Sequence, residues 1–474
     1  MAAAQRLRLI EAHFYERPVK LRLPFRFGVV TLREAPQLFV RARIAMQDGR
    51  EGEGISAELL VPKWFDKSPA LTNEDNFNQL RRALVIARRH VIAAGSNTAF
   101  GLSVVCDAGH RAECARAGLN GLVASFGLAL IERAIIDAFA RIENTPVFEL
   151  VRANRLGLTS VLTPDLDGFD LEKFVAGLTC ANTIFARHTV GLLDALTRAE
   201  TAGNRLEDGL PESLEEVIAT YGHHYFKLKV AGKIDADIER LGQIAAVLDR
   251  IAEPYTVTLD GNEQYDEVGA VIELWRRVAE DKHLTRLQAS TVLIEQPITR
   301  TRALSEPIHG LDVPVEVDES DADFGVFARA RALGYRGISA KSCKGFYRAL
   351  LNRARVAKFN AEDGGGYFMS AEDLTTQAGV AVQQDLALAA LVGAKHVERN
   401  GHHCVDGMAG APQAEQDAFL SAHEDLYRRT IDGRARLDIR HGVISLQSIA
   451  RAKGLATVVI PDWNAMSSSP TVEP

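Results

Sequence analysis

Five short stretches set the predicted architecture of the chain, and in chain order they read YFKLKV (225–230), TVTLDGNEQY (256–265), TVLIEQPI (291–298), VPVEVDES (313–320) and GISAKSCKG (337–345). In each stretch a run of β-forming residues leads into polar residues. This pattern is typical of a buried parallel strand that presents a polar side chain at its C-terminal end. The stretches follow one another at intervals close to the roughly 30 residues that one unit of a (β/α) barrel occupies.

Three further stretches complete a set of eight predicted strands, namely TIFARHTVG (183–191), YFMSAEDL (367–374) and HVERNGHH (396–403). Helical patterns lie between the strands, and in KIDADIERLGQIAAVLDRI (233–251) the apolar residues recur on one face. Eight strands that alternate with helices favour a closed barrel over an open doubly wound sheet. The predicted fold class is therefore α/β, a TIM-type (β/α) barrel.

The N-terminal residues 6–60 have a different pattern, which predicts an antiparallel meander of three strands. Asp48 and Gly49 form a strong hairpin-turn signal between the second and third strands. Between the first and second strands, LPFRFGVVTL (23–32) contains Pro and Gly and is predicted to be a loop.

Helical periodicity follows this meander at about 73–95 and at 122–143. Residues 107–121 have few large apolar side chains, so we predict a surface loop or insert there. After residue 405 the alternation of strands and helices stops, and the last ten residues are expected to be disordered. Three parts are predicted: an α+β domain (1–150), a (β/α) barrel (151–405), and a C-terminal segment (406–474) that either returns toward the N-terminal domain or forms a solvent-exposed appendage.

The composition sets limits on the class of protein. The chain has 474 residues, of which 47% are hydrophobic and 25% are charged, and its net charge is −7. A mildly acidic chain without basic runs argues against nucleic-acid or membrane partners, and the five scattered cysteines argue against a disulfide framework. We therefore expect a cytoplasmic protein.

Asp260, Glu295 and Asp318 follow three consecutive predicted strands. A single carboxylate at a strand end is most often a helix cap or a solvated loop residue. Three of them on neighbouring strands of a barrel converge on one mouth, where carboxylates without His or Cys suit Mg²⁺ better than Zn²⁺. The sequence therefore predicts a magnesium site, with helix capping as the alternative.

Lysines accompany these acids. Lys227 and Lys229 lie two residues apart on one predicted strand, so their side chains point to the same side. Lys341 occupies the matching place on the sixth strand. Buried lysines are costly unless charges balance them, which a metal site and an anionic substrate would do. A lysine at a strand tip can instead be a surface residue, and this reading suits Lys344 best.

Histidine pairs suggest a different metal. His223 and His224, and the run His402-His403-Cys404, invite a Zn²⁺ interpretation. Adjacent residues on a strand face opposite ways and do not both bind one ion, so we expect polar or pocket-lining side chains instead. Near the end of the eighth strand, Glu398 and His403 are candidates for substrate contact. Arg26, in the predicted loop above the mouth, is another candidate or is simply exposed.

Taken together, the motifs KLK, LDGN, IEQP, VDES and AKSCK resemble those of the enolase superfamily, in its mandelate racemase/muconate lactonizing enzyme branch. ERAIIDAFARIENTPVFEL (132–150) is similar to the last helix of that family's capping domain, and the likeness spans about 15–405. The resemblance implies the following residues: Asp260, Glu295 and Asp318 as Mg²⁺ ligands, Lys229 and Lys341 as an opposed acid/base pair, Lys227 as an electrostatic aid to Lys229, and Asn262, Glu319 and Lys344 around the metal site.

The resemblance implies an isomerase or lyase that removes the proton α to a carboxylate and stabilises the enolate with Mg²⁺. Its substrate is then a small-molecule carboxylate, and a homo-oligomer is expected. Racemisation, epimerisation and cycloisomerisation all fit. The seventh strand has Glu372 and Asp373 but no histidine, and the eighth lacks paired aspartates, so the substrate is left open. The alternatives are β-elimination from a hydroxy acid, a Schiff-base lysine lyase, and a non-catalytic binding protein that descends from such an enzyme.

Overall fold

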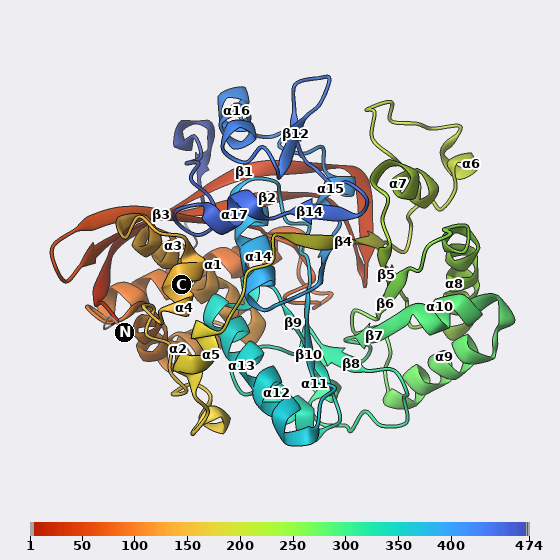
Figure 1. The fold of residues 1–474 in the computed structure, drawn as a ribbon, viewed down its shortest axis with the longest axis horizontal. Coiled ribbons are helices and arrows are strands. Elements are labelled where there is room, and N and C mark those ends of the chain that lie inside the picture. The colour runs from red at the N-terminus through yellow and green to blue at the C-terminus, as the bar shows by residue number, and fades with distance from the viewer. Residues whose placement is uncertain (1–3, 471, 473–474) are drawn as a thin grey trace.

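Eight parallel strands form the wall of a barrel in the computed structural model, which describes residues 4–470 and 472 (Figure 1). They are β4 (Thr183–Val190), β5 (Tyr225–Lys229), β6 (Thr256–Asp260), β7 (Thr291–Glu295), β8 (Val315–Val317), β9 (Gly337–Ala340), β10 (Phe368–Ala371) and β11 (His396–Arg399). Their order is β10-β9-β8-β7-β6-β5-β4-β11, and the sheet curls until its end strands β10 and β11 contact each other. The predicted barrel and all eight predicted strands are confirmed.

Helices cover the outside of this barrel. They are α7 (Leu214–Tyr221), α8 (Ile234–Leu248), α9 (Val268–Glu280), α10 (Thr285–Ser290), α11 (Arg300–Ala303), α12 (Val326–Ala332), α13 (Phe346–Asp363), α14 (Val380–Leu391) and α15 (Gly401–Cys404). The predicted apolar stripe of α8 is buried at Leu241, Ile244 and Leu248, and Ile234 and Ile238 pack at its edge. Burial of such a stripe against the strands is what holds each helix on the barrel.

A second, antiparallel sheet contains β1 (Leu7–Phe27), β2 (Val30–Met46), β3 (Glu51–Leu59) and the short β15 (Ser467–Ser468), in the order β15-β1-β2-β3. The meander is confirmed, and Gly49 makes its second turn with φ of 90°. The predicted loop at 23–32 is wrong, because β1 and β2 stay paired up to a tight turn at Gly28. Phe25 and Phe27 gain burial from this pairing, and Pro24 lies in an irregular stretch of it.

Helices α1 (Asn73–Ala93), α2 (Ala99–Arg116) and α3 (Gly121–Ile142) pack beside this sheet, followed by the short α4 (Val147–Arg152), α5 (Leu171–Ala176) and α6 (Arg198–Thr201). The helices predicted at 73–95 and 122–143 are confirmed. The predicted loop or insert at 107–121 is wrong, since most of it belongs to α2. Thr98 caps this helix by accepting a hydrogen bond from the backbone N–H of Gly101, and the small face formed by Cys106, His110 and Cys114 is buried.

After residue 405 the chain forms α16 (Gln413–Ala422), β12 (Tyr427–Arg429), β13 (Ala435–Leu437), β14 (Val443–Ser445) and α17 (Gln447–Arg451). Strand β14 pairs with β4 of the barrel, and β15 pairs with β1 at Tyr15 and Glu16. The segment therefore contacts both sheets, while the boundaries of the three proposed domains stay a prediction. The last ten residues are not uniformly disordered as predicted, because β15 lies among them; residues 471, 473 and 474 of that prediction lie outside the described residues.

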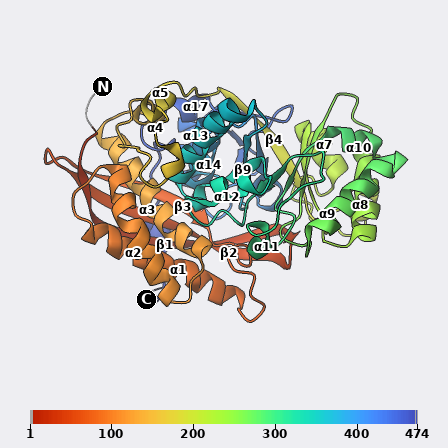
Figure 2. The ribbon, with the colours of Figure 1, turned by 90° about the horizontal axis from the view of Figure 1, so that it is seen from below.

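The long strands β1 and β2 connect the two halves of the molecule. Figures 1 and 2 show α1–α3 at one side, α8–α10 at the other, and the β1–β2 ribbon running from the first group to the barrel. The described part of the chain has no helix with both the length and the apolar character that a membrane span requires.

Candidate active site

The three predicted carboxylates lie together at the C-terminal end of the barrel. Asp260 and Glu295 are the last residues of β6 and β7, where their backbones are paired, and Asp318 follows β8 directly. All three side chains are fully buried. The strands deliver them to one place because the C-terminal ends of parallel strands in a barrel share one mouth.

Two lysines flank these carboxylates. Lys229, at the end of β5, donates to Asp260 Oδ2 at 2.5 Å, and Lys341, just after β9, donates to Asp318 Oδ2 at 2.5 Å. Four places separate β5 from β9 in the strand order, so the two ammonium groups stand on opposite sides of the barrel. Both line the same narrow chamber, which has a volume of about 20 Å³.

Lys227 lies one layer deeper and is in contact with four carboxylates. Its Nζ is 2.6 Å from Glu295, 2.7 Å from Glu372, and 2.9 Å from Asp260 and from Glu398. Burial alone would lower the pKa of Lys227, but the charges of Asp260 and Glu295 outweigh it and raise the pKa well above its ordinary value. Lys227 is therefore a fixed positive charge beneath the chamber.

Glu295 is the least satisfied of the buried acids. Neither carboxylate oxygen accepts a hydrogen bond with acceptable geometry from any described residue, although Lys227 is close. Burial, together with the charges of Asp260 and Glu372, raises the pKa of Glu295 well above its ordinary value. Buried carboxylate oxygens that lack partners are suitable ligands for a hard divalent cation, so the residues present fit Mg²⁺.

A second set of acids shares Glu295. Oxygens of Glu295, Glu316 and Glu372 lie within 4.8 Å of one another. Glu372 is paired with Arg187 of β4, and burial and the charge of Glu372 raise the pKa of Glu316 to about 8. This set lies toward the inside of the barrel, whereas the chamber borders Lys229 and Lys341, so we place the chemistry at the chamber. The sequence analysis missed Arg187 and Glu316; Glu316 precedes Asp318 by two residues and so had to face the same side.

Asn262, Glu319 and Lys344 lie around the carboxylates. Asn262 donates its backbone N–H to Asp260 and its amide to Glu319 at 3.2 Å. The reading of Lys344 as a surface lysine is wrong, because the residue is buried, donates to Ser339 at 2.7 Å and lies 3.3 Å from Asp318.

Elements outside the barrel cover the chamber. Val61 and Trp64 from the segment 61–67 line it, and Lys341 Nζ lies 4.3 Å from the centre of the Trp64 ring. Lys67 fixes this segment to the barrel through the carbonyl of Asn262 at 2.6 Å. Because the cover is tied down by such contacts, the chamber is closed in this state.

The β1–β2 hairpin supplies the rest of the cover, through Phe25 and Phe27. Arg26 lies between them, so its side chain points to the other side of the strand, where it is half-buried and donates to Thr31 at 3.3 Å. The structure thus does not bring the Arg26 side chain into the chamber, and the two phenylalanines, which the sequence analysis overlooked, take its place.

Of the two candidates at the end of β11, the structure brings only one to the chamber. Glu398 lines it and accepts hydrogen bonds from Lys227 at 2.9 Å and from Thr189 at 2.7 Å. His403 lies on α15, where its ring packs against that of His188. It is not among the described residues that line the chamber.

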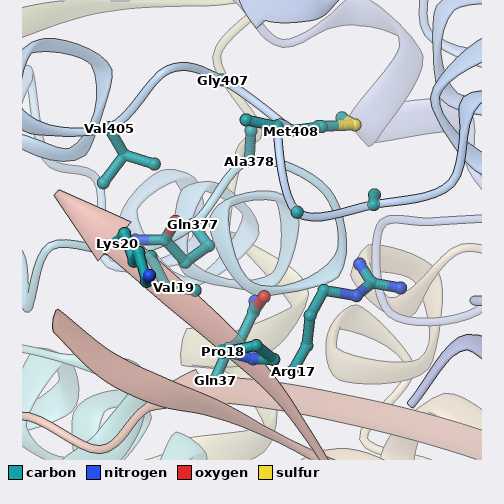
Figure 3. A pocket seen from close by; sticks show the side chains of 13 residues that line it. Arg17, Pro18, Val19, Lys20, Gln37, Gln377, Ala378, Val405, Gly407 and Met408 are labelled. Carbon is teal, nitrogen blue, oxygen red and sulfur yellow. The ribbon is translucent and has the colours of Figure 1, made fainter. Parts of the chain in front are cut away.

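A larger hollow of about 270 Å³ opens elsewhere, between β1 and the loop 405–411 (Figure 3). Arg17, Lys20, Gln37 and Gln377 are its polar lining residues. Carboxylates and histidines are absent from the described residues that line it. The hollow therefore offers no carboxylate group to hold a cation, so it is not the candidate active site.

No family model and no curated protein matches the sequence. Solved structures do match. A member of the enolase superfamily from Roseovarius nubinhibens ISM is 18% identical, with 97% of this chain and 95% of that chain covered and a TM-score of 0.56. A muconate lactonizing enzyme from Pseudomonas fluorescens, complexed with muconolactone, is 16% identical, with 97% and 98% covered and a TM-score of 0.57.

An enolase from Bradyrhizobium, complexed with magnesium and mandelic acid, is 15% identical, with 98% of both chains covered and a TM-score of 0.59. A dipeptide epimerase from Enterococcus faecalis V583, complexed with Mg and the dipeptide L-Leu-L-Tyr, is 14% identical, with 92% and 99% covered and a TM-score of 0.57. The chain thus has the fold of enolase-superfamily structures over nearly its whole length, which confirms the predicted resemblance at the level of fold.

Proposed function

We propose that the protein is a magnesium-dependent enzyme of the enolase-superfamily type that removes the proton α to a substrate carboxylate and catalyses racemisation, epimerisation or cycloisomerisation. One observation supports this most directly. Lys229 and Lys341 face one chamber from opposite sides of the barrel, and the buried carboxylates lie between them. A planar carbon acid bound there would present one face to each amine.

Asp260, Glu295 and Asp318 are the residues that would hold Mg²⁺. When bound, the cation would neutralise the negative charge that develops on the substrate carboxylate as its α-proton leaves. The solved structures with this fold include complexes with magnesium, which agrees with the proposal.

The two lysines would move the proton. Burial alone would lower the pKa of Lys341, but the charges of Asp318 and Glu295 outweigh it and raise the pKa. Lys341 must lose this attraction before it can accept a proton. A Mg²⁺ ion held by Asp318 and Glu295 would weaken this attraction, and its positive charge would lower the pKa of the Lys341 amine. In the proposed reaction one lysine accepts the α-proton and the other returns a proton to the opposite face.

The covering side chains would exclude water and select the substrate. Trp64, Phe25 and Phe27 present aromatic surface to the chamber, whose volume of about 20 Å³ is far below that of an amino acid or hydroxy acid. The hairpin and the segment 61–67 must therefore open to admit substrate. Aromatic cover above a carboxylate and lysine floor suits a substrate with a carboxylate at one end and an apolar group at the other.

The proposal is tested by α-proton exchange in D₂O with Mg²⁺ present, using libraries of amino acids, dipeptides and hydroxy acids. With a substrate that exchanges, Lys229→Ala should abolish exchange from one stereochemical series and keep part of it in the other, and Lys341→Ala should do the reverse. Lys358→Ala, at a half-buried lysine paired with Glu362 outside the barrel mouth, is the matched control.

Other outcomes contradict the proposal. If neither lysine variant reduces exchange, the two-base mechanism is excluded. Loss of exchange from both series with only one of the variants indicates a one-base elimination, and a keto product from a hydroxy acid would identify it. Borohydride trapping of substrate on one lysine would instead establish Schiff-base chemistry.

A further inference from the structure

Three histidines meet on the outside of the barrel wall, away from the chamber. On β4, Arg187 and Thr189 contact Glu372 and Glu398 inside the barrel, so His188 between them points outward. His223 precedes β5, and His402 lies on α15. Ring nitrogens of His188, His223 and His402 lie within 4.8 Å of one another.

The ring nitrogens of this cluster have few partners. His223 Nδ1 lies 3.0 Å from the carbonyl oxygen of Ala186, to which the neutral ring donates its N–H. This leaves the lone pair of His223 Nε2 free. His223 Nε2, His188 Nδ1 and both nitrogens of His402 are buried and have no hydrogen-bond partner in residues 4–470 and 472. Buried polar atoms without partners are rare in native proteins and call for a bound water or ion.

The cluster also has the protonation state that a ligand needs. Burial lowers the pKa of His223 to about 4, and burial together with the neighbouring rings lowers the pKa of His188 and of His402 well below the ordinary value. All three rings are therefore neutral near pH 7. Neutral imidazole is the form that binds metals, and a ligating ring commonly donates its other N–H to a backbone carbonyl, as His223 does.

We propose that His188, His223 and His402 bind a Zn²⁺ ion that fastens α15 to the start of β5 and to β4. Imidazole nitrogen is a preferred ligand of Zn²⁺, at roughly 2.0–2.1 Å, so tetrahedral ligands stand roughly 3.3 Å apart. Ring nitrogens that lie within 4.8 Å of one another need to approach by up to about 1.5 Å, and rotation of the side chains would bring them closer. His403 Nδ1 is buried without a partner beside His188, with ring centres 5.2 Å apart, and is the candidate fourth donor.

The proposed site differs from the rejection of zinc made from the sequence. That rejection assumed that His402 and His403 continue a strand, whereas they lie in the one-turn helix α15. It also considered only neighbours in the chain. The histidine that completes the cluster, His188, lies on another strand, and its role follows only from the packing of β4 against α15.

The cluster has a route to solvent and balanced surroundings. A cavity of about 20 Å³ is lined by Tyr221, Arg399 and His402, and it shares Gln377 and Val405 with the open hollow of Figure 3. An ion could reach His402 along this path. The positive charge of Arg399 is neutralised by Asp385 at 2.7 Å and by Asp373 at 3.4 Å, so it does not oppose a cation at full strength.

The experiment measures zinc binding by equilibrium dialysis of the full chain against ZnCl₂, with MgCl₂ in excess to occupy the carboxylate site. The parent should bind one Zn²⁺, and His188→Gln and His402→Gln should each weaken binding about 100-fold or more, since loss even of residues that only orient ligands costs 10- to 100-fold. His283→Gln, at an exposed histidine, is the matched control. Glu295→Gln should leave this binding unchanged, which separates the histidine site from the proposed magnesium site.

Two measurements on the parent keep the proposal falsifiable if a variant fails to fold. Zn²⁺ should raise Tm in excess Mg²⁺, and crystals grown with Zn²⁺ should show an anomalous peak between the three imidazoles. No stoichiometric zinc binding in the parent, an anomalous peak only at the barrel carboxylates, or unchanged binding in folded His188→Gln and His402→Gln would each overturn the site. Ordered water would then be the occupant of the cluster.

Discussion

Replacing Lys227 with methionine tests whether the barrel interior depends on one buried ammonium group. Four carboxylates lie within 2.9 Å of its Nζ, and the residue is 1% exposed. At an effective dielectric of about 20, one such contact is worth roughly 6 kcal/mol of attraction, but burying the ammonium costs several kcal/mol. Removing one partner from a buried ionic network typically costs about 3–5 kcal/mol, and we expect Lys227→Met to lower the free energy of unfolding by that amount.

Urea denaturation in the presence of a chelator measures this loss. Lys229→Met, which removes contact with Asp260 alone, should cost less, and Lys358→Met should cost at most about 0.5 kcal/mol. Adding Glu295→Gln to Lys227→Met should recover at least about 1 kcal/mol, because Lys227 is the one cation of the described residues within ion-pair distance of Glu295 and its loss leaves that carboxylate without a counter-charge. The reasoning fails if Lys227→Met unfolds within about 1 kcal/mol of the parent, or if the two substitutions are simply additive.

Three further predictions concern a proposed metal ligand, the cover of the chamber and a buried acid of α3. Glu295→Gln should weaken Mg²⁺ binding in calorimetry with little effect on folding; parent-like binding would contradict the ligand assignment. Phe27→Ala should change the ratio of kcat/KM between substrates and leave the Mg²⁺ dependence as in the parent. Arg26→Ala should change neither quantity. The reverse result would indicate that Arg26, and not Phe27, contacts the substrate. Burial raises the pKa of Glu132 to about 7, so the free energy of unfolding should fall as pH rises from about 4.5 to 7. Glu132→Gln should reduce the difference in the free energy of unfolding between pH 5 and pH 8 by up to roughly 2–3 kcal/mol. An unchanged pH dependence in this variant would refute the prediction.

The barrel could be predicted because each strand has a recognisable local sequence pattern. In TVTLD and TVLIE a short β-forming run ends in the acid that lies at the mouth, and the spacing between runs sets the order of the wall. The placement of Asp260, Glu295 and Asp318 at the mouth could be predicted for the same reason. The positions of Lys229 and Lys341 beside them could also be predicted, since the two lysines occupy equivalent places on their strands.

Features that depend on contacts between distant segments could not be predicted. Helix α2 buries Cys106 and Cys114, small side chains whose burial requires a neighbouring helix that the local pattern does not reveal. Strands β1 and β2 stay paired up to Gly28, where Phe25 and Phe27 pack over the barrel mouth. The barrel residues there, such as Lys229, are more than 200 residues away in the chain. The histidine cluster likewise joins three elements that periodicity describes separately.

The pairing of β15 with β1 has a consequence for the order of events during synthesis. The edge of β1 around Tyr15 and Glu16 pairs with Ser467 and Ser468. On a ribosome that adds about 5–20 residues per second, this edge stays open for on the order of half a minute after β1 emerges. An open strand edge can pair with other chains. The same strand ends at Phe27, so the cover of the chamber belongs to a sheet whose last strand, β15, is synthesised more than 400 residues after β1.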